Sequence, residues 1–137
     1  MRLENKLDVI AKLGQPDCET DRRDVGTEIT YSWYKLFFDL NEELYGIQID
    51  NYDSHNASSF NFKNENFRIE PWLMKSPIAP KFKEVVEQLK NELIEFEIIK
   101  RYGRCPIRLS SGVEIDFYEE PDDIEERELW GFRYCSI

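Results

Sequence analysis

The sequence predicts an α+β fold in which two helix-plus-β-meander repeats form one antiparallel sheet with the helices on one face. Three observations support this: apolar residues at helical spacing near the start of each half, several stretches of strict apolar–polar alternation, and a match between two distant segments. The chain has 137 residues, which suits a single domain. We expect a first repeat over 1–50, a connector over 51–79 and a second repeat over 80–137.

The first half begins with an amphipathic helix. Apolar residues recur at helical spacing from Leu3 to Leu13, and Gly14 then supplies a stop signal, so we expect a helix over about 2–13. The polar residues 15–27 are expected to be irregular.

Three strands follow in the first half. Apolar and polar residues alternate over 28–33, shift phase at Tyr34 and resume over 36–38. After a turn at 40–42 the alternation continues over 44–50. These stretches predict a meander that packs one face on the helix.

The connector contains two kinds of segment. Residues 51–66 are rich in Asn and Ser and predict a loop, with a short hairpin made by 60–62 and 67–69. The prolines of 71–80 predict an extended chain that ends with Pro80 as the first residue of the second helix.

The second half repeats this order. We favour a helix over 80–92 and a strand over 94–101, although apolar residues would also allow one long helix through 93–101. Two strands over 107–109 and 113–117 follow, joined by a turn that ends at Gly112. An acidic loop over 119–128 and a last strand over 129–135 complete the half.

An internal match suggests a duplication. Residues 43–49 read Glu-Leu-Tyr-Gly-Ile-Gln-Ile, and residues 128–134 read Glu-Leu-Trp-Gly-Phe-Arg-Tyr. Each segment is preceded by a helix and a strand pair, so we infer two meanders that lie side by side in one sheet. Alternation then predicts the residues of the covered face: Tyr45, Ile47, Ile49, Trp130, Phe132 and Tyr134. The opposite, uncovered face receives Gly46, Gln48, Asp50, Gly131 and Arg133.

The charge is concentrated in one segment. The chain carries 28 acidic and 18 basic residues, a net charge of −10. Residues 119–128 alone contribute −6 of this. Such a balance disfavours nucleic-acid binding, which needs clustered Lys and Arg, and permits a basic protein partner. We expect the acidic loop and the uncovered face to bind that partner, through Phe37, Gln48, Asp50, Asp116, Tyr118, Glu119, Glu120, Asp122, Asp123, Glu125 and Glu126.

The sequence assigns no catalytic residue, no metal ligand and no cofactor. His55 is the only histidine and stands in an Asn-rich loop, where Asp53 and Asp50 give no metal-ligand spacing. Glycine-rich phosphate loops are absent. A pair of carboxylates for acid–base chemistry stays open as an alternative, because pairing is invisible in sequence.

The compartment is expected to be the cytoplasm. The first residues lack the apolar core of a secretory signal, and no apolar run is long enough to span a membrane. The three cysteines (Cys18, Cys105 and Cys135) are far apart, which indicates reduced thiols rather than a disulfide framework.

Two resemblances extend this reading. The run Leu-Gly-Gln-Pro-Asp at 13–17, the strand pair and residues 44–49 resemble one repeat of the β-lactamase-inhibitor-protein-like fold, which also occurs in small bacterial outer-membrane assembly lipoproteins. That resemblance implies a sheet whose face grips a protein. A small acidic helix-and-meander chain also resembles immunity proteins of bacterial polymorphic toxin systems, which implies a basic toxin domain as partner.

The sequence therefore predicts a non-catalytic protein-binding module, of the immunity type. Two alternatives stay open. One is a small-ligand-binding or carboxylate-based enzymatic domain, and the other is a structural subunit of a homodimer. For the chain itself we expect a monomer or a weak homodimer.

Overall fold

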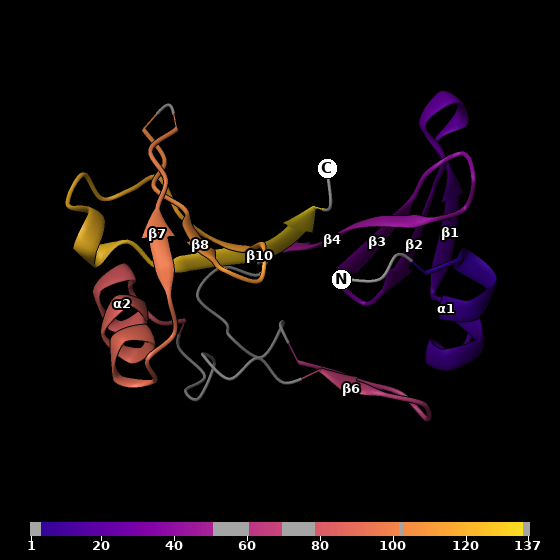
Figure 1. Ribbon diagram of the computed structural model, residues 1–137, viewed down its shortest axis with the longest axis horizontal. Helices are drawn as coiled ribbons and strands as arrows, with labels where there is room; N and C mark the ends of the chain where they lie inside the picture. Colours follow the sequence, from indigo (N-terminus) through magenta and orange to yellow (C-terminus); the bar gives the residue numbers. More distant parts are fainter. Residues whose placement is uncertain (1–3, 51–60, 70–78, 102, 136–137) are drawn as a thin grey trace.

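The computed structural model describes residues 4–50, 61–69, 79–101 and 103–135. These residues form two α-helices, one eight-stranded antiparallel sheet and a separate two-stranded hairpin (Figure 1). The helices are α1 (Lys6–Leu13) and α2 (Phe82–Asn91), and the hairpin consists of β5 (Phe62–Lys63) and β6 (Arg68–Ile69). The large sheet contains β1 (Cys18–Asp21), β2 (Thr27–Tyr31), β3 (Tyr34–Phe38), β4 (Leu44–Asp50), β7 (Phe96–Ile98), β8 (Ile107–Leu109), β9 (Val113–Phe117) and β10 (Leu129–Cys135). The α+β prediction is confirmed.

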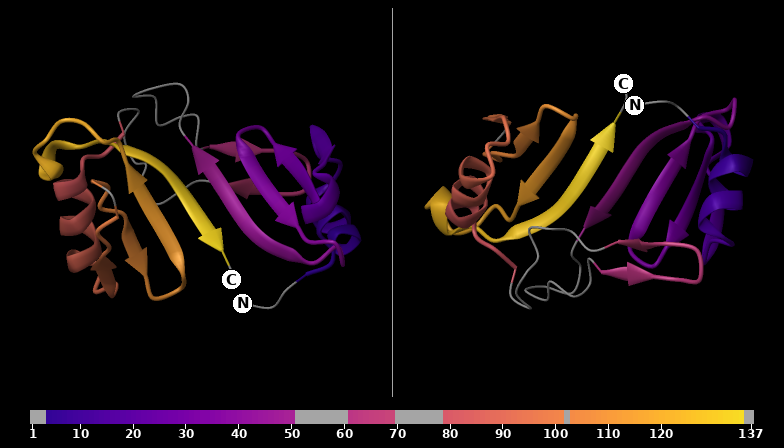
Figure 2. Two further views of the ribbon diagram at one scale, coloured as in Figure 1. Left: turned by 90° about the horizontal axis from the view of Figure 1, so that it is seen from above. Right: turned by 60° about the horizontal axis from the view of Figure 1, so that its bottom comes forward.

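The strand order is symmetric about the centre of the sheet. It runs β1-β2-β3-β4-β10-β9-β8-β7, so each half supplies a four-stranded meander and the halves meet where β4 pairs with β10. Gln48 faces Arg133 at the middle of this central ladder. Figure 2 shows α1 and α2 at opposite ends of the sheet. That the halves descend from one duplicated unit stays a prediction.

Helix α1 is shorter than the predicted helix over 2–13. Asn5 is extended and acts as the N-cap, because its side chain accepts a hydrogen bond of 2.9 Å from the Leu7 N–H. The helix ends at Gly14, whose φ of 91° is readily adopted only by glycine. Within these bounds Val9 is buried against the sheet, which fixes the helix on its predicted face.

The prediction of an irregular segment over 15–27 is wrong. This segment forms the edge strand β1 and a short 3₁₀ helix, η1 (Arg23–Val25). All four residues of β1 are exposed, so the strand has no apolar alternation that sequence reasoning could detect. It pairs with β2 through its backbone, as in the pair formed by Glu19 and Ile29, and Glu19 also lies 3.6 Å from Lys6.

The turn between β2 and β3 corrects a second prediction. Strand β2 ends at Tyr31, and Ser32 adopts a φ of 56°, so the chain reverses before Trp33. Trp33 is therefore 43% exposed in the turn instead of continuing the apolar face of the strand.

The ambiguous stretch near residue 94 is a strand rather than a continued helix. Helix α2 ends at Asn91, and Leu93 turns the chain with a φ of 58° before β7 pairs with β8. The helix begins after Lys81, whose N–H donates to the Glu84 carboxylate, so Pro80 lies just outside the helix instead of opening it. Strand β7 covers only part of the predicted strand over 94–101.

One hydrophobic core serves both halves. Its most deeply buried members come from α2 and from strands on both sides of the central ladder, namely Ile29, Tyr31, Phe38, Ile49, Val85, Leu89, Ile107, Ile115 and Leu129. The Tyr31 ring also meets the rings of Phe62 and Phe67 edge-on, at centroid distances of 6.0 and 5.4 Å. The hairpin β5–β6 therefore packs on the same side of the sheet as the helices.

A bulge at the same place in each half puts one side chain on the face of the sheet opposite to the predicted one. The register between β3 and β4 shifts between Phe37 and Phe38, and Tyr45 falls at this bulge. The register between β9 and β10 shifts in the same way around Trp130. Tyr45 and Trp130 consequently pack beside Phe37 and Tyr118, not in the core as predicted.

The other predictions for the covered face hold where core contacts show them. Ile49 is buried, and Ile47 and Phe132 pack against the core. Tyr134 does not belong to this core and lines the depression described below. The Asp50 side chain and residues 51–60 and 70–78 of the connector expected over 51–79 lie outside what the structure describes.

Candidate functional site

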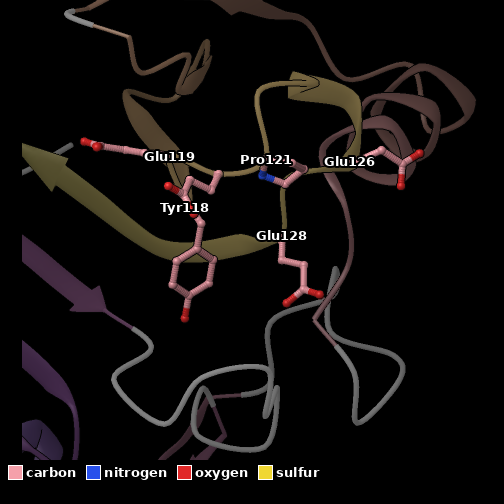
Figure 3. Close-up of a pocket in the computed structure, with 6 residues that line it drawn as sticks. Tyr118, Glu119, Pro121, Glu126 and Glu128 are labelled. Atoms are coloured by element: carbon pink, nitrogen blue, oxygen red, sulfur yellow. The ribbon is translucent and has the colours of Figure 1, made fainter.

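A cavity of about 480 Å³ lies where the acidic loop leaves β9. Its lining consists of Tyr118, Glu119, Glu120, Pro121, Glu126 and Glu128 (Figure 3). The side chains of Tyr118 and Glu128 point in the same direction, whereas Glu119 and Glu126 point to opposite sides. The cavity therefore has an aromatic ring and a carboxylate side by side, with further carboxylates around them.

The loop is fixed by its single basic residue. Arg127 is buried, and its guanidinium donates hydrogen bonds of 2.7 Å to the Pro121 carbonyl and 3.0 Å to the Gly103 carbonyl. The Asp123 side chain caps the short 3₁₀ helix η3 (Ile124–Glu126) by accepting from the Glu125 N–H. A loop held in this way presents its carboxylates from one conformation.

Glu126 anchors the loop to helix α2. Its carboxylate accepts hydrogen bonds from Lys81 at 2.7 Å and Lys83 at 2.5 Å. These bonds lower the pKa of Glu126 to about 2 and raise the pKa of Lys83. Glu126 is therefore ionised at neutral pH and serves to hold the loop in place.

Other acidic side chains of the loop face solvent. Glu119, Glu120 and Asp122 are exposed, and within the described part of the chain no Lys or Arg forms an ion pair with them. Burial, together with the charge of Glu128, raises the pKa of Tyr118, which keeps its hydroxyl protonated. These negative charges create an attractive potential for a cation at the cavity.

The uncovered face of the second half is filled by ion pairs within the chain. Asp116 is only 3% exposed and lies 2.8 Å from Arg104 and 2.9 Å from Arg133. Glu114 pairs with Arg101 at 3.0 Å and with Arg108 at 2.9 Å, and these bonds outweigh burial to lower the pKa of Glu114. Burial is the largest single influence on the pKa of Glu114, and it raises that pKa. This part of the sheet is charged, but its charges already have partners.

A shallow depression of about 300 Å³ lies mainly on the uncovered face of the first half and extends to β10 of the second half. It is lined by Arg22, Phe37, Tyr45, Gly46, Ile47, Gln48, Arg133 and Tyr134. The Arg22 guanidinium lies 5.1 Å from the centre of the Phe37 ring, and the Tyr45 ring lies 6.1 Å from it. The depression is thus aromatic and basic, in contrast to the acidic cavity.

The structure divides the predicted binding residues whose side chains it describes among four places. Four of them line the acidic cavity, three lie beside it on the loop, and Asp116 belongs to the ion-pair network. The four are Tyr118, Glu119, Glu120 and Glu126, and the three are Asp122, Asp123 and Glu125. Phe37 and Gln48 line the separate depression.

Sequence reasoning missed several residues of these sites. Glu128 and Pro121 line the cavity, and their place within the acidic segment was the available signal. Arg22 lies in the segment read as irregular, and no pattern in the sequence connects it with Phe37.

The described residues contain no group of three His, Cys, Asp or Glu side chains that could hold a metal ion. His55 and Asp53 lie outside these residues. In the same part of the chain, neither helix has the length and apolar character needed to span a bilayer. In comparisons with known proteins, no family model, curated protein or solved structure matches the chain.

Proposed function

We propose that this chain is a non-catalytic protein-binding module that masks a basic protein, in the manner of an immunity protein bound to a toxin domain. The observation that carries the proposal is the acidic cavity, where Tyr118 and Glu128 stand together and Glu119 and Glu120 line the same opening. The uncovered sheet face of the second half contributes less than expected, because Asp116 and Glu114 are paired within the chain.

The chemistry of the cavity suits a lysine or arginine side chain from the partner. A cation is attracted both to the face of an aromatic ring such as Tyr118 and to neighbouring carboxylates. Because Arg127 and Glu126 already hold the loop, little further ordering is needed when the partner binds. The exposed charges also accelerate encounter with a basic surface, and this acceleration weakens as salt rises.

The direct test is coexpression with the product of the adjacent gene, followed by purification of the pair. An immunity protein restores growth to cells that make the toxic product, and the purified proteins form a stoichiometric complex. A neighbouring product that is harmless, or that forms no complex with this chain, would overturn the immunity role.

A matched pair of variants locates the contact. Glu119→Gln with Glu120→Gln removes two charges from the cavity, and Glu65→Gln with Glu87→Gln removes two exposed charges elsewhere. We expect the association rate constant with the partner to fall about tenfold for the first pair and to stay near that of the unaltered chain for the second. Equal effects of both pairs would show that only total charge matters.

A second candidate, a small-ligand or carboxylate-based enzymatic site, is favoured by the number of glutamates around the same cavity. General acid catalysis needs a carboxyl with a raised pKa. Glu126, which lines the cavity, has its pKa lowered instead. A screen of small cationic ligands by heteronuclear NMR distinguishes the candidates, since specific shifts at Tyr118 and Glu128 without a protein partner would favour this one.

The oligomeric state distinguishes the remaining alternative. A binding module without its partner is expected to sediment as a monomer at micromolar concentration. A stable dimer would favour a structural subunit.

A further inference from the structure

The depression on the first half has a composition that the proposed function does not use. Its rings come from Phe37 and Tyr45, and its charges come from Arg22 and Arg133. No carboxylate is among the residues that line it. In a chain with a net charge of −10, a cavity whose ionic lining is wholly basic is an exception.

We propose that this depression is a second binding site, specific for an aromatic group that carries a carboxylate. The rings of Phe37 and Tyr45 form an apolar wall against which a flat apolar group can pack. The two guanidinium groups offer planar donors that match a carboxylate. The basic charge distinguishes this depression from the acidic cavity, which also has an aromatic ring but is lined by carboxylates. A ligand for the depression therefore needs both an apolar ring and a negative charge.

Arg22 supplies the available positive charge. Arg133 already lies 2.9 Å from the Asp116 carboxylate, which holds its guanidinium in place and offsets its charge. Arg22 forms no ion pair with any described residue and rests 5.1 Å from the centre of the Phe37 ring. A guanidinium placed over a ring at the edge of a depression can close on an anion without first breaking an ion pair with any residue that the structure describes.

Gly46 keeps the floor of the depression open. A Cβ atom at this position would lie 3.3 Å from the Tyr134 carbonyl oxygen and 3.5 Å from the Phe37 ring. The absence of a side chain thus lets the Phe37 ring lie over the strand backbone. The volume of about 300 Å³ is at the lower end of small-molecule sites, which suits a single ring with a short acidic arm.

The test compares two probes that differ only in charge. N-acetylphenylalanine carries the carboxylate, and N-acetylphenylalaninamide replaces it with a neutral amide. Titration of the isotope-labelled full chain is followed through the backbone amide signals of Gly46 and Gln48. We expect saturable shifts with the acid and at least tenfold weaker binding of the amide. Equal binding of both probes, or no shift with either, would overturn the proposal.

Two variants assign the charge and the ring. Arg22→Gln is expected to weaken binding of the acid about tenfold, while the neighbouring Arg23→Gln, with the same change in net charge, leaves it unchanged. Phe37→Leu keeps an apolar side chain but removes the ring, and it is expected to weaken binding of the acid and the amide alike. An unaltered affinity in Arg22→Gln would refute the role of that guanidinium.

Two further arms separate the source of the ligand and the two sites. Phenylacetate represents a free small acid, whereas a short peptide ending in phenylalanine represents the C-terminus of a polypeptide. The tighter of the two identifies the source. Glu119→Gln with Glu120→Gln is expected to leave probe binding intact, so this site stands or falls independently of the proposed partner contact at the acidic cavity.

Discussion

The two halves of the molecule share a backbone plan but differ at equivalent positions of the uncovered face. In the first half Phe37 stands opposite Gly46, and in the second half Asp116 stands opposite Gly131. The first arrangement produces an aromatic depression, and the second produces a network of ion pairs. The comparison teaches that strand register decides which positions face outward, while the residue at each position decides what that face can bind.

The halves also differ where the third strand joins the fourth. In the first half a tight turn is closed by Asp39, whose carboxylate accepts from the N–H groups of Asn41 and Glu43. In the second half the acidic loop with η3 occupies the same place. The candidate binding cavity is thus a feature of one half only.

Truncation of a core side chain in each half tests whether the halves share one core. Leu36→Ala in the first half and Ile115→Ala in the second each remove buried apolar volume, and each is expected to lower the free energy of unfolding by about 2–5 kcal/mol. Denaturant unfolding followed by tryptophan fluorescence measures this. Both variants should shift one common transition. Two separate transitions, each moved by one variant, would show that the halves fold independently.

The glycines in the loops between the first two strands of each half should respond differently. Gly26 has a φ of 118°, and a Cβ there would collide with the Phe38 carbonyl oxygen, so Gly26→Ala is expected to cost about 3 kcal/mol of stability. Gly103 has a φ of 81° but open space around it, so Gly103→Ala is expected to cost about 1 kcal/mol. Thermal unfolding of both variants provides the measurement, and equal losses would contradict the steric argument.

The ion-pair network is expected to matter in one half only. Arg104→Gln combined with Arg133→Gln leaves the buried Asp116 carboxylate without a cation, at a cost of about 2 kcal/mol once the partial exposure of the arginines is considered. In the first half Lys35→Gln changes a cation on the same face and is expected to shift stability by less than about 0.5 kcal/mol. Similar losses in both variants would mean that the network is not specific to the second half.

The smallest effect is a dependence on pH from the anchor of the acidic loop. Glu126 has a pKa of about 2 in the fold against 4.5 for the free group, so its contribution to stability is complete above about pH 4.5. That contribution is lost as the pH falls toward 2 and Glu126 is protonated. Unfolding curves of Glu126→Gln should therefore change less with pH across this interval. A profile parallel to that of the unaltered chain would contradict the anchor.

Strong alternation made the central strands predictable. The sequence predicted 44–50 and 129–135 as strands, and β4 and β10 occupy these positions. Strand β1 escaped prediction because an exposed edge strand has no apolar face to reveal it. Tyr45 and Trp130 were placed on the wrong face because each is the extra residue of a bulge, and the regular alternation of the residues that follow does not reveal a bulge.

The candidate sites were predictable only in part. The acidic loop was visible as a run of charge, but its anchoring by Arg127 and Glu126 depends on contacts between distant residues. The aromatic depression depends on Arg22 reaching Phe37 across a turn, and such proximity is created by the fold.

The order of the strands also determines how the sheet can assemble. Within the large sheet, every neighbouring pair except β4 and β10 joins strands that follow one another in the chain. Only the central ladder, from Gly46 paired with Cys135 to Asp50 paired with Gly131, closes a long loop and so carries most of the entropic cost of closure. We expect each meander to form rapidly and the pairing of β4 with β10 to limit the rate of folding. The length and stiffness of the segment between the halves should therefore control that rate.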